Sequence, residues 1–120
     1  MTEQESGKSR LNSERALSLG QIAELERQFT AIVASAADGS AGGDDEHDPE
    51  GATVAFERQH VAALLARARA HLDAIDAALR KVDSGIYEKC DICDGPIGAE
   101  RLAARPSALT CVRCAAKRHA

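Results

Sequence analysis

Four cysteines are the residues in this sequence whose type and spacing best suit chemistry. They form two pairs, Cys90-x2-Cys93 and Cys111-x2-Cys114, with seventeen residues between the pairs. Two residues between paired cysteines let one tight turn direct both thiolates at one metal ion, and a second pair completes a tetrahedron with Zn–S distances of about 2.3 Å. The spacing therefore predicts one structural zinc ion bound by all four thiolates. A complete set of four leaves no position for a catalytic water.

Two disulfides, or a thioredoxin-like redox pair, are the alternatives for these cysteines. The polar stretch Met1–Arg10 lacks the apolar region of a secretion signal, so we expect a cytoplasmic protein, in which metal ligation is commoner than disulfides. A redox Cys-x-x-Cys usually begins a helix in a βαβ context, and no strand pattern precedes Cys90. No apolar run reaches the ~18 residues of a membrane span, so no membrane partner is expected.

The segment that carries the cysteines has a thin apolar core. Its sizeable apolar residues are Ile86, Tyr87, Ile92, Ile97, Leu102 and Leu109. So small a set buries too little surface to fold a short segment unaided. Structural zinc sites supply about 10–16 kcal/mol of apparent binding energy in small finger peptides, which exceeds such a deficit. We therefore expect residues 85–120 to form a zinc-finger domain that depends on its metal.

Two long helices are predicted upstream of this domain. Apolar residues at alternating spacings of three and four mark the seam of a coiled coil in each helix. The first seam consists of Ile22, Leu25, Phe29, Ile32 and Ala36. The second consists of Val54, Val61, Leu65, Ala68, Leu72, Ile75, Leu79 and Val82, with a break at Arg58. Thr53 is a good N-cap for the second helix, and Asp83-Ser84-Gly85 ends it.

A Gly-rich and acidic connection at residues 38–52 separates the two helices. Pairing within one chain has the smaller entropy cost, so the seams are expected to pack against each other. The predicted fold is mainly α: a flexible lead at 1–10, an antiparallel coiled-coil helical hairpin at 11–84 with its acidic tip at 38–52, and the zinc-finger domain at 85–120. This arrangement predicts a monomer, and pairing of the helices between two chains is the alternative.

The charge of the 120-residue chain argues against a general nucleic-acid coat. The formal net charge is -4, with no Trp, one Tyr and two Phe, whereas nucleic-acid binders carry basic surfaces and often stacking aromatics. The charges are unevenly placed. Acids concentrate at residues 44–50, and residues 101–118 hold only basic charges. A zinc-finger nucleic-acid binder that uses this basic stretch is the main alternative function.

Residues 78–114 resemble the DksA/TraR zinc-finger family. The most specific part of the resemblance lies between the cysteine pairs and reads Arg101-Leu102-x-Ala104-x-Pro106-x-Ala108. Further matches are Ala78-Leu79-Arg80-Lys81-Val82, Gly85-Ile86-Tyr87, Ile97 and the cysteines themselves. The resemblance implies a transcription regulator that binds bacterial RNA polymerase through its secondary channel, without sequence-specific DNA binding. The coiled-coil tip would then approach the active centre.

The same resemblance implies roles for the acidic tip. The family's tip motif is Asp-x-x-Asp-x-Ala, and here Asp45 and Asp48 supply the two acids, while Glu50 stands in the place of Ala. Paired acids at a hairpin tip also occur in transcript-cleavage factors, which makes RNA cleavage an alternative activity. The leading interpretation is a regulator that is not an enzyme and has no catalytic residues.

Some family members respond to the alarmone ppGpp through basic side chains on the second helix and just after the last cysteine. Ungapped counting places Arg67 at one of these positions, but Ala74 and Ala115 at two others. An anion site without its cations loses most of its attraction. We therefore expect ppGpp synergy to be weak or absent.

Overall fold

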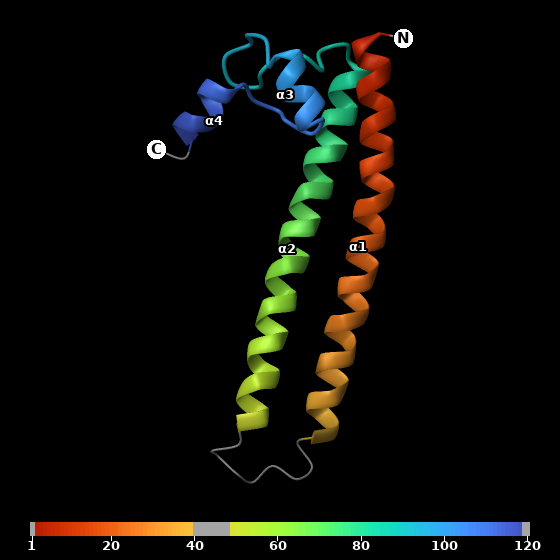
Figure 1. The fold of residues 1–120 in the computed structure, drawn as a ribbon, viewed down its shortest axis with the longest axis vertical. Coiled ribbons are helices and arrows are strands. Elements are labelled where there is room, and N and C mark those ends of the chain that lie inside the picture. The colour runs from red at the N-terminus through yellow and green to blue at the C-terminus, as the bar shows by residue number, and fades with distance from the viewer. Residues whose placement is uncertain (1, 40–48, 119–120) are drawn as a thin grey trace. The chain divides into compact units, whose positions relative to one another are not determined.

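The structure, a computed structural model, describes residues 2–39 and 49–118. Four helices run through these ranges: α1 (Glu3–Gly39), α2 (Pro49–Asp83), α3 (Ala99–Ala104) and α4 (Val112–Arg118) (Figure 1). Within the described residues the β pairing is confined to one isolated antiparallel bridge, Lys89–Pro96. No helix in this part of the chain is long and apolar enough to cross a membrane.

Two compact units divide the chain. Unit 1 comprises Met1–Ser18 and Ala70–Ala120, and unit 2 comprises Leu19–Arg69. Each unit therefore contains part of α1 and part of α2, and unit 1 also contains the four cysteines.

In unit 2, α1 and α2 pack along the predicted seams. Ile22 and Leu25 on α1 and Val61, Leu65 and Ala68 on α2 are buried. The guanidinium of Arg69 lies 3.5 Å from the carboxylate of Glu26, so the last α2 residue of this unit pairs with the first half of its α1 segment. The two helices are therefore antiparallel. Arg58, at the predicted break of the second seam, is exposed.

In unit 1, the same pairing continues with more polar side chains. Leu11 and Ile75 are fully buried. Arg15 Nε lies 2.7 Å from Asp76 Oδ1, again in the antiparallel sense. Leu11, Arg15 and Ser18 continue the four-three spacing of the first seam toward the N-terminus. These pairings confirm the predicted mainly α fold, an antiparallel coiled-coil hairpin with a C-terminal four-cysteine domain.

The N-terminal residues differ from the predicted flexible lead, because α1 begins at Glu3. The reason is a capping box. The Thr2 hydroxyl accepts the backbone N–H of Glu5 at 3.1 Å, and the Glu5 carboxylate accepts the backbone N–H of Thr2 at 3.2 Å. Leu11 and Gly7 then pack into unit 1, so tertiary contacts hold this polar segment in a helix.

The boundaries of the connection also differ from those predicted. α2 begins at Pro49, four residues before the expected N-cap Thr53, because proline is well suited to the first turn of a helix, where its missing N–H is not needed. α1 extends to Gly39. The tip acids Asp45 and Asp48 lie outside the described residues.

The end of α2 confirms the predicted stop. Gly85 adopts a left-handed conformation with φ 75°. Its N–H donates to the carbonyl of Val82 at 3.0 Å, and the N–H of Ile86 donates to the carbonyl of Lys81 at 2.9 Å. These two bonds form a Schellman motif, which satisfies the last carbonyls of the helix.

Candidate zinc centre

The first cysteine pair sits on a tight turn that follows α2. Cys90 N–H donates to the carbonyl of Gly95 at 2.8 Å, and Asp94 N–H donates to the carbonyl of Cys90 at 3.0 Å. Asp94 has a φ of 61°, a left-handed conformation that Asp tolerates better than most residues. The Gly95 N–H points at Cys93 Sγ at 3.4 Å. This turn, residues 90–95, is called the first knuckle below.

The second cysteine pair lies at the start of α4. Cys111 immediately precedes this helix and Cys114 lies in its first turn, where the carbonyl of Cys111 accepts the N–H of Ala115 at 2.9 Å. The turn at residues 111–114 is the second knuckle, and two hydrogen bonds from backbone N–H groups join this region to the first knuckle. Cys111 N–H donates to Cys90 Sγ at 3.3 Å, and Asp91 N–H donates to the carbonyl of Leu109 at 2.9 Å.

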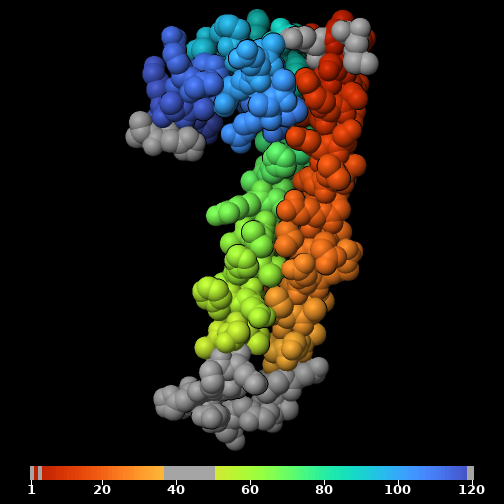
Figure 2. Space-filling view, in the orientation of Figure 1, coloured from red at the N-terminus to blue at the C-terminus, as the bar shows by residue number. Residues whose placement is uncertain are grey.

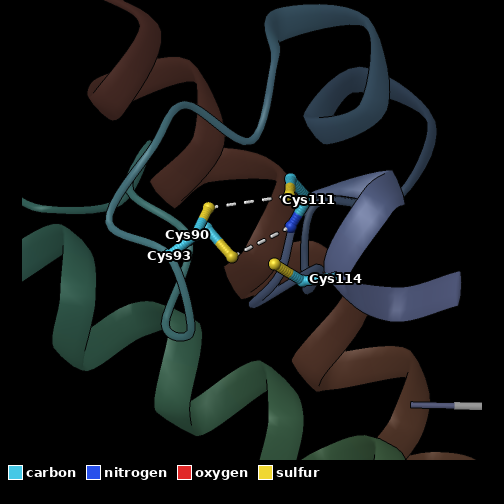
Figure 3. A group of neighbouring side chains, drawn as sticks. All are labelled: Cys90, Cys93, Cys111 and Cys114. Carbon is cyan, nitrogen blue, oxygen red and sulfur yellow. Dashed lines mark hydrogen bonds between the residues drawn. The ribbon is translucent and has the colours of Figure 1, made fainter. Parts of the chain in front are cut away.

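The two knuckles bring all four sulfur atoms together. The Sγ atoms of Cys90, Cys93, Cys111 and Cys114 lie within 4.8 Å of one another, and Figure 3 shows them converging from both knuckles. Cys93 Sγ and Cys111 Sγ are 3.9 Å apart. A zinc tetrahedron with Zn–S of about 2.3 Å requires S–S separations of roughly 3.8 Å. All four are free thiols, so the arrangement is that of a metal site and not of two disulfides.

Three of the four thiols have a shifted pKa, and the pattern of these shifts favours a bound cation. Burial alone would raise the pKa of Cys90, but backbone N–H groups, those of Cys93 and Cys111 first, outweigh it and lower the pKa to about 6. The pKa of Cys111 is lowered, chiefly by the backbone N–H of Cys114. The pKa of Cys114 is raised to about 12, first by its contact with the Cys111 thiol and then by burial. Neighbouring thiolates oppose one another's ionisation, and a bound divalent cation removes that opposition.

The motif between the cysteine pairs builds the core beneath the knuckles. Tyr87 is buried, and its hydroxyl donates to the carbonyl of Pro106 at 2.8 Å. Leu102 and Ala108 are buried with it. Arg101 Nε donates to the carbonyl of Thr110 at 2.8 Å, which fixes the residue that precedes the second knuckle. The Arg-Leu-x-Ala-x-Pro-x-Ala pattern therefore positions the second cysteine pair.

Residues 85–118, which contain both cysteine pairs and are called the knuckle domain, pack directly on the hairpin segments of unit 1. Figure 2 shows the mid-blue segment that includes α3 against the first turns of α1, in red, while the darker blue α4 lies on the side away from α1. Tyr87, Ile97 and Leu102 share one core with Leu11 of α1 and Ile75 of α2. Zinc binding and the packing of these helix ends therefore involve the same group of residues.

Sequence reasoning missed two residues that support this site, Lys81 and Gly7. Lys81 is buried although it is charged, and it contacts the first knuckle. Its spacing of three from the buried Ala78 was the available signal. Gly7 allows α1 to approach Tyr87 closely. Asp45 and Asp48, the predicted tip acids, lie outside the described residues, so their place relative to the sulfur cluster stays a prediction.

Comparison with known proteins agrees with this geometry. Residues 85–119 match the model of the prokaryotic dksA/traR C4-type zinc-finger family. The RNA polymerase-binding transcription factor DksA of Haemophilus influenzae is 42% identical over 48 residues, 40% of this chain and 33% of that protein. A Bacillus subtilis protein, the uncharacterized protein YteA, is 36% identical over 66 residues, 55% of this chain and 28% of that protein.

A solved structure extends the likeness along most of the chain. Transcription factor DksA2 from Pseudomonas aeruginosa has a TM-score of 0.58 and 27% sequence identity, over 98% of this chain and 87% of that one. The sequence matches to DksA of Haemophilus influenzae and to YteA are shorter, and they span about a third or less of each relative's length.

Four clustered cysteines from two Cys-x2-Cys turns define a C4-type zinc finger, which here follows a helical hairpin. The chain carries the zinc finger of the DksA/TraR family at residues 85–119. The sulfur cluster fits the family's metal, so the protein binds one structural zinc ion through its four cysteines. A closed set of four thiolates makes that ion a structural element.

Proposed function

We propose that this protein is a transcription regulator that binds bacterial RNA polymerase through the secondary channel, with its coiled-coil tip toward the active centre. It acts without sequence-specific DNA binding. The observation that carries the proposal is the likeness to transcription factor DksA2, which extends over 98% of the chain and so includes the hairpin as well as the zinc finger. The sequence match to a polymerase-binding DksA over 48 residues supports the same conclusion.

The hairpin has dimensions that suit a narrow channel. Within the described residues, unit 2 consists of paired segments of α1 and α2, so its cross-section there is that of two helices, roughly 20 Å. α2 has 35 residues, which at about 1.5 Å per residue makes it about 50 Å long. A stiff element of this kind places a tip with little loss of entropy on binding.

The tip acids are the groups we propose to act at the active centre. Asp45 and Asp48 lie between the end of α1 and the start of α2 in the sequence. Carboxylates there would be attracted to a centre that contains magnesium ions. We propose that they modulate the polymerase and that the protein catalyses no reaction itself. Cleavage of RNA in a stalled elongation complex on addition of the protein would instead identify a transcript-cleavage factor.

The proposed response to ppGpp is weak or absent. Ala74 and Ala115 stand where responsive members carry basic side chains, and both line an open cavity of about 600 Å³ in unit 1. Arg101, Arg105 and Arg118 line the same cavity. These arginines retain some attraction for an anion but do not replace both missing cations. A large stimulation of the protein's effect by ppGpp would contradict this part of the proposal.

The second candidate function is nucleic-acid binding by the zinc finger. Arg113, Lys117 and Arg118 are exposed on α4, which favours this candidate. The buried position of Tyr87 counts against it, because the ring is unavailable for base stacking. DNA binding without polymerase, with a steep fall as salt is added, would support this alternative.

Transcription from a short-lived promoter complex tests the proposed role of the tip. The double variant Asp45→Asn/Asp48→Asn should bind polymerase within a few-fold of the parent, because most contact area lies along the hairpin and zinc domain, yet lose much of the regulatory effect. The matched control Glu57→Gln/Asp73→Asn removes the same number of charges from exposed positions on α2 and should regulate like the parent at saturating protein, where a loss of hairpin contacts with polymerase no longer limits the effect. Full regulation by the tip variant would show that the activity lies elsewhere.

A further inference from the structure

Lys81 is fixed in place by the end of α2. Its backbone carbonyl accepts the N–H of Ile86 at 2.9 Å in the Schellman motif that closes the helix. Gly85, with a φ of 75°, makes that closure possible. The backbone of Lys81 therefore cannot shift without opening the last turn of α2.

The side chain of Lys81 is buried, which is rare for lysine. Only 9% of it is exposed. Its ammonium lies 2.9 Å from Asp91 Oδ1 and also donates to the backbone carbonyl of Lys89. Burial of an ammonium is unfavourable unless such partners replace its water. The first knuckle supplies both partners.

Lys8, at the same end of the hairpin, makes a far more exposed ion pair than Lys81 does. Lys8 Nζ lies 3.8 Å from Asp83 Oδ1, and the two side chains are 54% and 71% exposed. Exposed pairs of this kind contribute little to stability. Lys81 differs because it is held between a helix and a loop, where each lost partner leaves a buried charge without compensation.

Both partners of Lys81 flank the same metal ligand. Lys89 precedes Cys90 and Asp91 follows it. Asp91 also donates its N–H to the carbonyl of Leu109, two residues before Cys111, so this residue of the first knuckle contacts both the end of α2 and the segment that leads into the second cysteine pair. Ligands held in their binding geometry lose less conformational freedom when a metal binds, and the groups that hold them commonly affect metal affinity.

We propose that Lys81 is a positioning residue of the zinc site. From the last turn of α2, it holds the first knuckle in the conformation that binds zinc, and so it couples zinc binding to the closure of the helix. This inference concerns the metal site alone and does not depend on polymerase binding.

Release of zinc to a colorimetric chelator from the full-length, zinc-loaded protein tests the proposal. Lys81→Met keeps most of the buried stem but removes the ammonium. It should release zinc about tenfold faster than the parent, at the low end of the range for residues that orient metal ligands. Lys8→Met removes the exposed lysine from the same end and should release zinc at the parent rate. Equal release by Lys81→Met and the parent would overturn the proposal.

Thermal unfolding with and without zinc separates a positioning role from general packing. The thermal midpoint of the zinc-stripped protein, followed by its helical circular dichroism signal, should be the same for Lys81→Met and the parent. The midpoint of the zinc-loaded protein should be lower for Lys81→Met. An equal loss in both states would mean that Lys81 merely stabilises α2, and it would overturn the proposal. Should Lys81→Met fail to fold, Asp91→Asn serves in its place, since the Asp91 side chain is 49% exposed and asparagine keeps one oxygen that can accept from the Lys81 ammonium. It should also accelerate release, and an unchanged rate would again contradict the inference.

Discussion

Gly7 of α1 lies so close to the ring of Tyr87 that a Cβ on Gly7 would fall 2.4 Å from Tyr87 Cε2. Tyr87 has no room to withdraw, because it is 1% exposed and its hydroxyl donates to the carbonyl of Pro106. The contact joins the first turns of α1 to the core beneath the zinc site. The packing of Tyr87 against α1 therefore requires a residue without a side chain at position 7.

Gly7→Ala should therefore destabilise the protein. Helix propensity alone would favour alanine by up to about 1 kcal/mol, but forcing a methyl group into a packed core costs about 1–3 kcal/mol. The clash should dominate, and a lower thermal midpoint of the zinc-loaded protein would show it.

Gly20→Ala provides the matched control for Gly7→Ala. Gly20 also lies within α1, but a Cβ there meets nothing within 4 Å. Only the propensity effect remains, so this variant should be stabilised by about 0.5–1 kcal/mol. If both variants were stabilised equally, the close packing of Gly7 on Tyr87 would be wrong.

Removal of zinc should unfold residues 85–118 and leave part of the hairpin helical. The knuckle domain has a small core, and its fold depends on metal binding energy. Far-UV circular dichroism after chelation should keep most of its helical signal, while amide exchange becomes fast throughout the knuckle domain. Elemental analysis of the untreated protein should give one zinc per chain. Retention of a folded knuckle domain without metal would contradict this dependence.

Cys111→Ser should weaken zinc retention by more than the roughly 10–100-fold that is typical for loss of an outer-shell partner, because it removes a soft ligand. Val112→Ser is the neighbouring control, since Val112 is 62% exposed and binds no metal. Chelator competition measures the zinc affinity of both variants. Equal affinities would exclude Cys111 as a ligand.

Ile75→Ala should destabilise the hairpin end in unit 1 by about 2–5 kcal/mol, the usual result of truncating a fully buried aliphatic side chain. Leu17→Ala should change stability by less than about 0.5 kcal/mol, because Leu17 is 75% exposed. Denaturant unfolding of both variants measures the difference. Similar values would mean that Ile75 is not a core residue of the folded protein.

The seams also predict a monomer, because each already has a partner within the chain. Ile22 and Leu25 on α1 and Val61 and Leu65 on α2 are buried within unit 2. Light scattering at micromolar concentration should give the mass of one chain. A stable dimer would favour pairing of the helices between two chains.

Spacing alone predicted the four zinc ligands and the helix seams, because both follow local rules. A Cys-x2-Cys turn needs only its own residues, and seam residues such as Leu65 and Ile75 are apolar at a fixed period. The start of α1 was predicted incorrectly because its polar composition suggested a lead. The Thr2–Glu5 capping box was the overlooked signal there.

The contributions of Gly7 and Lys81 could not be predicted in this way. Glycine lowers helix propensity and lysine prefers solvent, so local preference gave the wrong expectation for both. Their roles depend on residues that are distant in sequence, Tyr87 for Gly7 and Asp91 for Lys81. Only the folded structure brings these partners together.

Binding of the zinc-loaded, full-length protein to bacterial RNA polymerase core enzyme tests the proposed function most directly. We predict a saturable complex with one protein per polymerase, which forms without DNA, and a crosslinker placed at residue 45 should react with polymerase residues that line the secondary channel. Under the same conditions the protein alone should not bind promoter DNA. An absence of binding to the core enzyme, with the zinc content intact, would contradict the proposed function.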